Sequence, residues 1–313
     1  MAFRSFFLLF FLLVLARISH SLPFVYFHGT GDSCSSENST HIVSYLKNVT
    51  GVEGECMEIG NGATDSVFMP INQQIQIACD KVKEAKHLRN GFNLFGISQG
   101  GLISRGVIQF CDGAPPVNNL ITLATPHAGL AFFPACDVFQ NWCPLVQYVW
   151  DKLVYTDLVQ DHIALAAHYK RPTMIKEYLK QSRLLPKLNN EHPQHRNATY
   201  NKRFSSLTTL VLLMNEGDIF AKPRESSWFG YYKDGSLKNL LPADETQLYK
   251  EDWIGLKILN ESGRVKRLKV PGNHAEATDK DLREFVAPFL MENSYNHHNP
   301  LPLITLSSNP TDF

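Results

Sequence analysis

Continuous apolar runs recur along the chain, and longer segments with helical spacing of apolar residues lie between them. The runs are at 23–27, 92–95, 120–124 and 207–214, and two further segments that contain charged residues, 54–59 and 265–270, also predict strands. The apolar runs predict strands buried on both faces of a parallel sheet. The segments that predict helices are 38–50, 70–88, 100–110 and 281–291. The pattern therefore predicts an α/β fold with a mostly parallel central sheet.

The rhythm of strand and helix is lost between residues 130 and 203. This stretch is rich in aromatic residues at first and then has polar, His-rich loops. We therefore expect a core formed by 22–129 and 204–291, with 130–203 as a helical insertion. Such an insertion either adds to the core or caps it and builds an apolar groove above it.

Both ends of the chain differ from the rest. Residues 1–21 hold an uncharged apolar stretch followed by small residues, which is typical of a removed signal peptide. The stretch is short for a membrane span, so we expect no integral membrane segment in the mature chain. Residues 292–313 are rich in Asn, His, Pro and Ser and predict a disordered tail. The expected route is secretory, to a lysosome or vacuole or out of the cell.

The cysteines agree with this route, because six of them follow the predicted leader and an even number suits disulfides. Cys79 lies on the helix before the strand 92–95 and Cys111 ends the helix after it, so we expect a Cys79–Cys111 bond. Cys136 and Cys143 are close enough to close one loop of the insertion. Four glycosylation sequons begin at Asn38, Asn48, Asn197 and Asn260.

Charge excludes one class of function. The chain has 30 Lys and Arg and 30 Asp and Glu, and no basic cluster. Nucleic acid therefore has no electrostatic basis as a partner. With 44% hydrophobic residues, the chain can form a sizeable core, which suits one large domain with an insertion.

The strand at 92–95 leads into Gly96-Ile97-Ser98-Gln99-Gly100 and then into a predicted helix. A serine at such a junction lies in a strained turn that presents its hydroxyl, as in α/β-hydrolases, and the glycines let strand and helix pass closely. The N–H of Gln99, near the helix N-terminus, would stabilise an oxyanion. We therefore predict Ser98 as a nucleophile. A Gly-Ser turn without chemistry is the alternative.

A second glycine-rich loop, His28-Gly29-Thr30-Gly31-Asp32, follows the first predicted strand. In a hydrolase of this architecture, the loop after an early strand supplies the second oxyanion donor. We therefore expect the Thr30 N–H to be that donor. An ordinary turn between strand and helix is the alternative.

The orienting acid of a serine triad belongs just past a strand that follows the serine. The strand 207–214 ends in Asn215-Glu216-Gly217-Asp218, so Glu216 and Asp218 compete. We favour Asp218, because a turn at Gly217 would aim the shorter side chain inward. A solvated loop acid is the alternative.

The general base is expected in the loop after the last strand, where His274 lies. A solvent-exposed loop histidine is the alternative. His127 also follows a strand, but it precedes every candidate acid. Because this fold usually orders its partners as serine, acid and histidine, His127 is not expected to be the base.

Seven short segments carry a resemblance to a known family: 28–34, 58–60, 96–101, 227–232, 248–249, 256–257 and 273–274. Together they resemble the palmitoyl-protein thioesterases, over residues 24 to 291. The Trp228-Phe229-Gly230-Tyr231-Tyr232 segment is the most specific, because it is not a general hydrolase feature.

The resemblance implies a lysosomal-type α/β-hydrolase that cleaves thioester-linked long-chain fatty acids from protein cysteines. Ser98, Asp218 and His274 would form its triad, and the insertion its acyl groove. The resemblance also supports Cys79–Cys111 and Cys136–Cys143. The family often has adjacent cysteines where this chain has Cys34-Ser35, so a Cys34–Cys56 bond is our own inference.

The expected partners are S-acylated proteins or peptides, with a long-chain fatty acid as product, and no cofactor or metal is expected. A long-chain acyl-CoA thioesterase or an oxygen-ester lipase would use the same triad. A non-catalytic lipid-binding protein on this scaffold is a further alternative.

Overall fold

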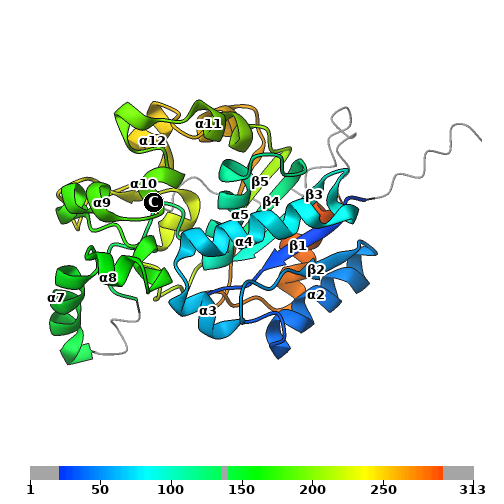
Figure 1. Ribbon diagram of the computed structural model, residues 1–313, viewed down its shortest axis with the longest axis horizontal. Helices are drawn as coiled ribbons and strands as arrows, with labels where there is room; N and C mark the ends of the chain where they lie inside the picture. Colours follow the sequence, from blue (N-terminus) through cyan, green and yellow to red (C-terminus); the bar gives the residue numbers. More distant parts are fainter. Residues whose placement is uncertain (1–20, 135–139, 292–313) are drawn as a thin grey trace, which may run out of the picture. The chain divides into compact units, whose positions relative to one another are not determined.

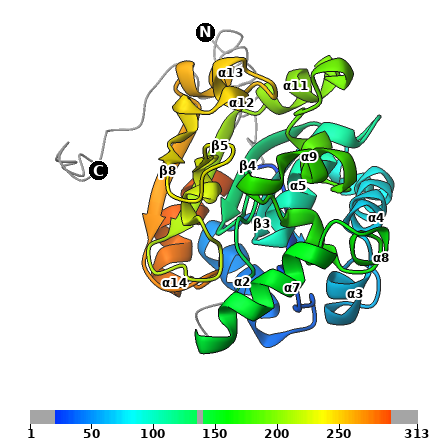
Figure 2. The same cartoon turned by 90° about the vertical axis from the view of Figure 1, so that its left-hand side faces the viewer.

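The central sheet has six parallel strands in the order β2, β1, β3, β4, β5, β8, of which Figure 1 labels the first five and Figure 2 labels β8. The computed structural model describes residues 21–134 and 140–291, and 22–291 form one compact unit. The strands are β1 (Phe24–Phe27), β2 (Gly54–Cys56), β3 (Phe92–Ile97), β4 (Val117–Leu123), β5 (Thr209–Asn215) and β8 (Val265–Val270). β1, β3 and β5 are buried along their whole length, which explains why most of their residues are apolar. The predicted α/β-hydrolase fold is confirmed.

Successive residues of each strand supply two separate cores. In β1, Val25 and Phe27 join the core under α4 (Ile71–Glu84) and α5 (Gln99–Phe110). Phe24 and Tyr26 join the core on the opposite face, under α2 (Glu37–Thr50) and α15 (Ala287–Met291). Since side chains alternate across a strand, one apolar run covers both faces. The helices therefore hold the sheet from both sides.

Two long excursions leave the sheet, one after β4 and one after β5. The first contains α7 (Cys143–Leu153), α8 (Asp157–Gln160), α9 (Ile175–Gln181), α10 (Leu185–Leu188) and α11 (Ala198–Ser205). Figure 2 shows α7, α8 and α9 in front of the strands. Tyr169 and Tyr178 of this excursion are buried in the same core as α5. The insertion is therefore helical, as predicted, and shares the core of the sheet.

The second excursion begins with a short helical turn, Arg224–Trp228, and an antiparallel hairpin. The strands of the hairpin are β6 (Tyr231–Tyr232) and β7 (Leu240–Leu241), and the excursion continues with α12 (Gln247–Lys250) and α13 (Leu256–Glu261). Two short helices lie outside both excursions, namely α3 (Ala63–Phe68) before β3 and α14 (Asp279–Asp281) after β8. A π-helical turn, Leu282–Val286, joins α14 to α15. The sequence predicted neither the hairpin nor this division of the last helix.

Two disulfides lie at the places predicted for them. Cys79–Cys111 joins α4 to the end of α5, and Cys34–Cys56 ties the loop after β1 to β2. Cys143 is also disulfide-bonded, but its expected partner Cys136 lies outside the described residues.

The four sequon asparagines differ in how accessible they are. Asn38, Asn48 and Asn197 are exposed, whereas the Asn260 amide donates to the Tyr249 hydroxyl at 2.7 Å. The predicted leader, apart from Ser21, and the predicted tail lie outside the described residues. Within the described part of the chain, no helix has the length and apolar character of a membrane span.

Candidate active site

The site lies where the order of the sheet strands reverses. From β1 the chain runs outward to β2, and it then returns to β3 on the other side of β1. Loops after β1 and β3 therefore diverge at the carboxyl ends of neighbouring strands, which is where open α/β sheets bind ligands. The β1 loop contains Thr30 and the β3 loop contains Ser98.

Ser98 occupies a strained turn between β3 and α5, with φ 52° and ψ −118°. A Cβ on Gly96 would lie 2.6 Å from the Gly101 backbone, and one on Gly100 would lie 2.0 Å from the Phe27 carbonyl oxygen. Only glycine allows these approaches without displacing the backbone. Positive φ at a non-glycine residue costs on the order of 1–3 kcal/mol, and the packed surroundings of Ser98 sustain this strain.

His274 links the serine to a carboxylate. Its Nε2 lies 2.9 Å from Ser98 Oγ, and its Nδ1 lies 2.7 Å from Asp218 Oδ2. The Asp218 side chain is fully buried, and that of His274 is 16% exposed. An Nδ1–H that donates to the carboxylate leaves Nε2 free to accept the serine proton. This is the geometry of a nucleophile, base and orienting acid.

The two competing acids face different ways. Asp218 Oδ1 accepts from the N–H groups of Phe220 at 2.9 Å and Ala221 at 2.8 Å, which leaves Oδ2 for His274. The Glu216 side chain is 52% exposed and lies 3.7 Å from Lys269. The structure therefore brings Asp218, and not Glu216, to the histidine.

Asn215, which the sequence analysis did not select, ties the acid loop to the histidine loop. Its buried side-chain amide donates to the carbonyl oxygens of Pro271 at 3.1 Å and Glu276 at 2.9 Å. Its Oδ1 accepts from the Ala275 N–H at 3.1 Å. Asn215 thus fixes the backbone on both sides of His274. An amide at the end of a buried strand, three residues before the candidate acid, is the only signal the sequence offers.

We expect Asn215→Asp to lower kcat about 100-fold with little change in KM, because small displacements of a catalytic group cost that much. An ionised aspartate would place acceptors against the carbonyl groups of Pro271 and Glu276, and protonation would restore one donor. The loss should therefore be smallest at acidic pH, as measured by the ratio of variant to wild-type kcat across pH.

Asn118→Ala is the matched control for Asn215. Asn118 is a buried asparagine at the opposite end of the sheet, where it bonds Asn93 and Thr208. It should lower thermal stability and leave the pH dependence of kcat unchanged. If Asn215→Asp also lowers thermal stability without changing the pH dependence of kcat, Asn215 does not position His274.

The two loops expected to supply oxyanion donors are in contact. The Thr30 hydroxyl donates to Gln99 Oε1 at 2.8 Å, and Gln99 Nε2 donates to the Ser66 carbonyl at 2.8 Å. A Cβ on Gly29 would lie 3.4 Å from Ser98 Cβ. As the first residue of α5, Gln99 has an N–H without an intrahelical acceptor. The side chains thus brace the backbone on which the proposed oxyanion hole depends.

His127 is a core residue. It is fully buried, its Nε2 lies 3.0 Å from the Thr122 hydroxyl, and its ring stacks on Phe229 with centroids 4.6 Å apart. Burial, and secondly the nearby Arg105 guanidinium, hold its pKa well below the ordinary value. His127 is therefore neutral and is not brought to Ser98 as a base.

His168 is a second neutral histidine, and the sequence analysis did not select it. It ends the short helical turn Ala164–His168 of the insertion and is buried. Burial, and secondly the electrostatic effect of His274, lower its pKa to about 3. It therefore adds no positive charge to the surroundings of His274.

Within the described ranges, His28, Cys34 and Glu58 are the one group with the composition of a metal site. The Cys34 sulfur is held in a disulfide, so it cannot ligate. His28 Nε2 lies 2.9 Å from Glu58, and the other Glu58 oxygen accepts from the Cys34 N–H at 2.7 Å. This cluster therefore shapes the loop that carries Thr30.

Comparison with known proteins finds similarity to one family of enzymes. A family model described as palmitoyl protein thioesterase matches residues 23–274. Palmitoyl-protein thioesterase 1 of Caenorhabditis elegans is 36% identical, over 82% of this chain and 87% of its own. Palmitoyl-protein thioesterase 3 of Dictyostelium discoideum is 34% identical, over 88% of this chain and 92% of its own. Lysosomal thioesterase PPT2-B of Xenopus laevis is 29% identical, over 58% and 62%.

Proposed function

This chain belongs to the palmitoyl-protein thioesterase family, and on that premise we propose that it removes long-chain acyl groups from protein cysteines through Ser98, His274 and Asp218. The observation that carries the assignment of these residues is the continuous hydrogen-bonded path from Ser98 Oγ to the buried Asp218 carboxylate. The substrate class follows from the family.

The proposed reaction passes through an acyl-enzyme. Ser98 Oγ attacks the thioester carbonyl carbon while its proton moves to His274 Nε2, and Asp218 stabilises the resulting imidazolium. The N–H groups of Thr30 and Gln99 bind the oxyanion. The tetrahedral intermediate collapses with loss of the cysteine thiolate, a good leaving group, which takes up the proton held by His274 and so returns the imidazole to its neutral form. Water, activated by His274, then releases the fatty acid from Ser98 by the same route.

We assign the acyl groove to the part of the insertion 130–203 formed by α7 and the residues beside it. Large apolar side chains are exposed on and beside α7, and they are Trp142, Leu145, Tyr148, Val149, Leu153 and Leu158. An acyl chain would cover part of this apolar surface. Each buried methylene contributes about 0.8 kcal/mol, so the proposal favours long chains over short ones.

A substrate panel tests the proposed function against the alternatives. We expect kcat/KM to be highest for an S-palmitoyl peptide, lower for palmitoyl-CoA and lowest for a triglyceride, and to rise with acyl length from eight to sixteen carbons. Product release is measured by chromatography. A preference for palmitoyl-CoA or for the triglyceride would favour the acyl-CoA thioesterase or the lipase. Stoichiometric fatty-acid binding without turnover or fluorophosphonate labelling would favour the lipid-binding protein.

We also propose a lysosome or vacuole as the site of action, with the secretory route as the broader assignment. Two disulfides among the described residues support an oxidising route, and so does the exposure of Asn38, Asn48 and Asn197. The Xenopus laevis relative is named a lysosomal thioesterase.

A further inference from the structure

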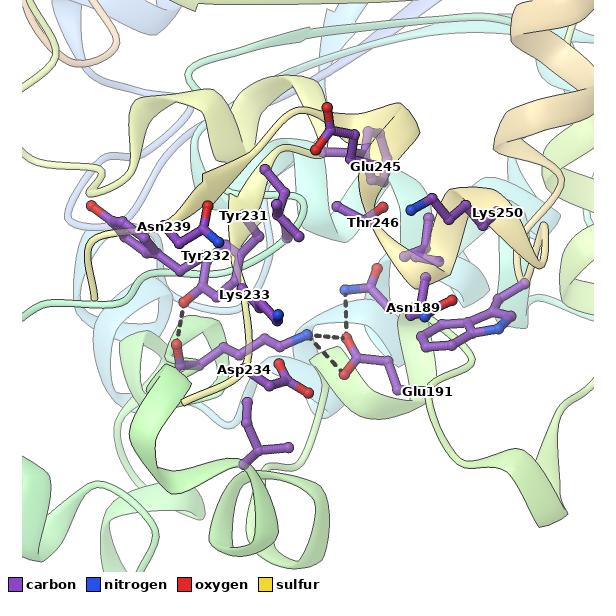
Figure 3. Close-up of a pocket in the computed structure, with 18 of the residues that line it drawn as sticks. Asn189, Glu191, Tyr231, Tyr232, Lys233, Asp234, Asn239, Glu245, Thr246 and Lys250 are labelled. Carbon is purple, nitrogen blue, oxygen red and sulfur yellow. Dashed lines mark hydrogen bonds and ion pairs between the residues drawn. The ribbon is translucent and has the colours of Figure 1, made fainter. Parts of the chain in front are cut away.

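A cavity of about 520 Å³ lies between the two excursions (Figure 3). Its walls come from Lys170, α9 and Asn189–Glu191 on one side, and from the β6–β7 hairpin and α12 on the other. None of the three triad residues lines it. Its volume falls in the range of sites that bind small molecules or parts of larger ones. The cavity is therefore a candidate binding site separate from the reacting atoms.

The cavity has a built polar floor. Lys170 Nζ and Glu191 are 3.0 Å apart and nearly buried, and Asn189 donates to the same carboxylate at 3.2 Å. The Tyr231 hydroxyl donates to the Lys170 carbonyl oxygen. The Gly235 N–H, at the tip of the hairpin, donates to the Pro172 carbonyl at 2.8 Å. The bonds made by Tyr231 and Gly235 join the hairpin to the insertion, and those of Lys170, Asn189 and Glu191 fix the polar groups of the insertion at this wall.

The family-specific Trp228–Tyr232 segment builds this wall. Trp228 Nε1 donates to the Leu212 carbonyl of β5 at 3.0 Å. Phe229, at φ 67°, stacks on the buried His127, while Tyr231 and Tyr232 line the cavity. The segment thus connects the sheet to the cavity, and no step of the proposed reaction uses it.

The charges of the lining select among ligands. Six charged side chains line the cavity, namely Lys170, Lys233, Lys250, Glu191, Asp234 and Glu245. Three positive and three negative groups give no net field to attract the phosphates of coenzyme A. A free fatty-acid chain would meet charged side chains along an otherwise apolar wall, which desolvation penalises. Neither ligand matches the lining.

A polypeptide segment does match it. Ile175 and Leu179 of α9 and Leu248 of α12 offer apolar surface for side chains. Asn239 and Gln247 offer side-chain amides, which can bond peptide N–H and C=O groups. Charged groups of both signs can pair with either kind of charged residue. The lining therefore suits a peptide of mixed sequence.

A continuous set of contacts joins the cavity to the triad. Phe220 stacks on His274, with ring centroids 4.5 Å apart. Two residues later, the Lys222 carbonyl accepts from the Ala131 N–H at 2.7 Å. Phe132, next in the chain, contacts Tyr232 edge-on at 6.2 Å, and both rings are half-buried. These contacts, with the backbone between them, connect one wall of the cavity to His274.

We propose that this cavity binds the polypeptide segment next to the acylated cysteine and so selects protein thioesters over other acyl thioesters. The proposal rests on the proposed function, because it names the substrate part that the triad does not touch. The acyl chain and the polypeptide would then occupy separate surfaces.

The test fills the cavity and compares two leaving groups. Ile175→Trp should raise KM for a short S-palmitoyl peptide about tenfold, with kcat for the peptide and both constants for palmitoyl-CoA within about twofold of wild type. Lys176→Trp places the same side chain at the adjacent exposed position of α9, which does not line the cavity. It should leave kcat and KM unchanged for both the peptide and palmitoyl-CoA. Gln247→Trp fills the cavity from an exposed position on α12 and should repeat the effect of Ile175→Trp.

A direct binding measurement tests the cavity without relying on catalysis. Fluorescein-labelled peptide of the same sequence without the acyl group should bind wild type and lose affinity about tenfold in both cavity variants, as measured by anisotropy. In the kinetic test, three results would overturn the proposal: an equal rise in KM for the peptide and for palmitoyl-CoA, no rise for either, or a larger rise for palmitoyl-CoA. If wild type hydrolyses neither thioester, the proposed function fails, and the anisotropy result still decides whether the cavity binds peptide.

Discussion

Ser98→Ala is expected to lower kcat for an S-palmitoyl peptide by about a millionfold, since removal of a serine nucleophile from a triad has effects of that order. The alanine lacks the only atom that can form the acyl-enzyme. The backbone of the turn should persist, because the Ser98 N–H donates to the Leu123 carbonyl at 2.8 Å and does not need the hydroxyl. Palmitate release measures the effect, and mass spectrometry should detect an acyl-enzyme with wild type and none with the variant.

The matched control for Ser98 is Ser104→Ala on the same helix. Ser104 is fully buried and donates to the Gly100 carbonyl at 2.8 Å. Its loss should cost about 1 kcal/mol of stability and leave kcat within about twofold. A Ser98→Ala protein that retains its melting temperature and still turns over at the wild-type rate would contradict the assignment of the nucleophile.

Asp218→Asn is expected to lower kcat about ten-thousandfold, the loss known for the equivalent change in a serine protease. The asparagine oxygen can still accept from the Phe220 and Ala221 N–H groups. Its NH₂ group would then face His274 Nδ1, which forces the proton onto Nε2. An Nε2–H cannot accept the Ser98 proton, so the base is lost while the fold is retained.

Glu216→Gln separates the two acids that the sequence left in competition. Because the Glu216 side chain is half exposed and pairs only with Lys269 among the described residues, this change should leave kcat within about twofold. Steady-state kinetics of both variants on the same S-palmitoyl peptide provide the measurement. A reversed result, with Glu216→Gln inactive and Asp218→Asn active, would move the orienting role to Glu216.

Local sequence was sufficient for much of the fold. Strands β1, β3 and β5 lie within two residues of the predicted runs, because strands buried on both faces consist mainly of apolar residues. The turn at Ser98 was also predictable, since the glycines at 96 and 100 are required by steric contacts within a few residues. The strand predicted at 54–59 ends at Cys56 instead, because only its first three residues pair with β1.

The sequence predicted a site residue only where a single strand and the loop after it are enough to place that residue. Ser98 and His274 each follow a strand whose carboxyl end must lie at the same edge of a parallel sheet. Asn215 was missed, because its role depends on the carbonyl groups of Pro271 and Glu276, more than fifty residues away. No local pattern reports such a partner.

By itself, the sequence determined the parallel sheet, the strained serine turn, the order of serine, acid and histidine, and the family. Those properties depend on short-range sterics and on the burial of whole segments, which residue type and spacing record directly. Only the tertiary structure decided that Asp218, rather than Glu216, meets His274, and that the Trp228–Tyr232 segment walls a cavity. Both depend on the direction of side chains between loops from different strands, and that direction is set by packing across the whole domain.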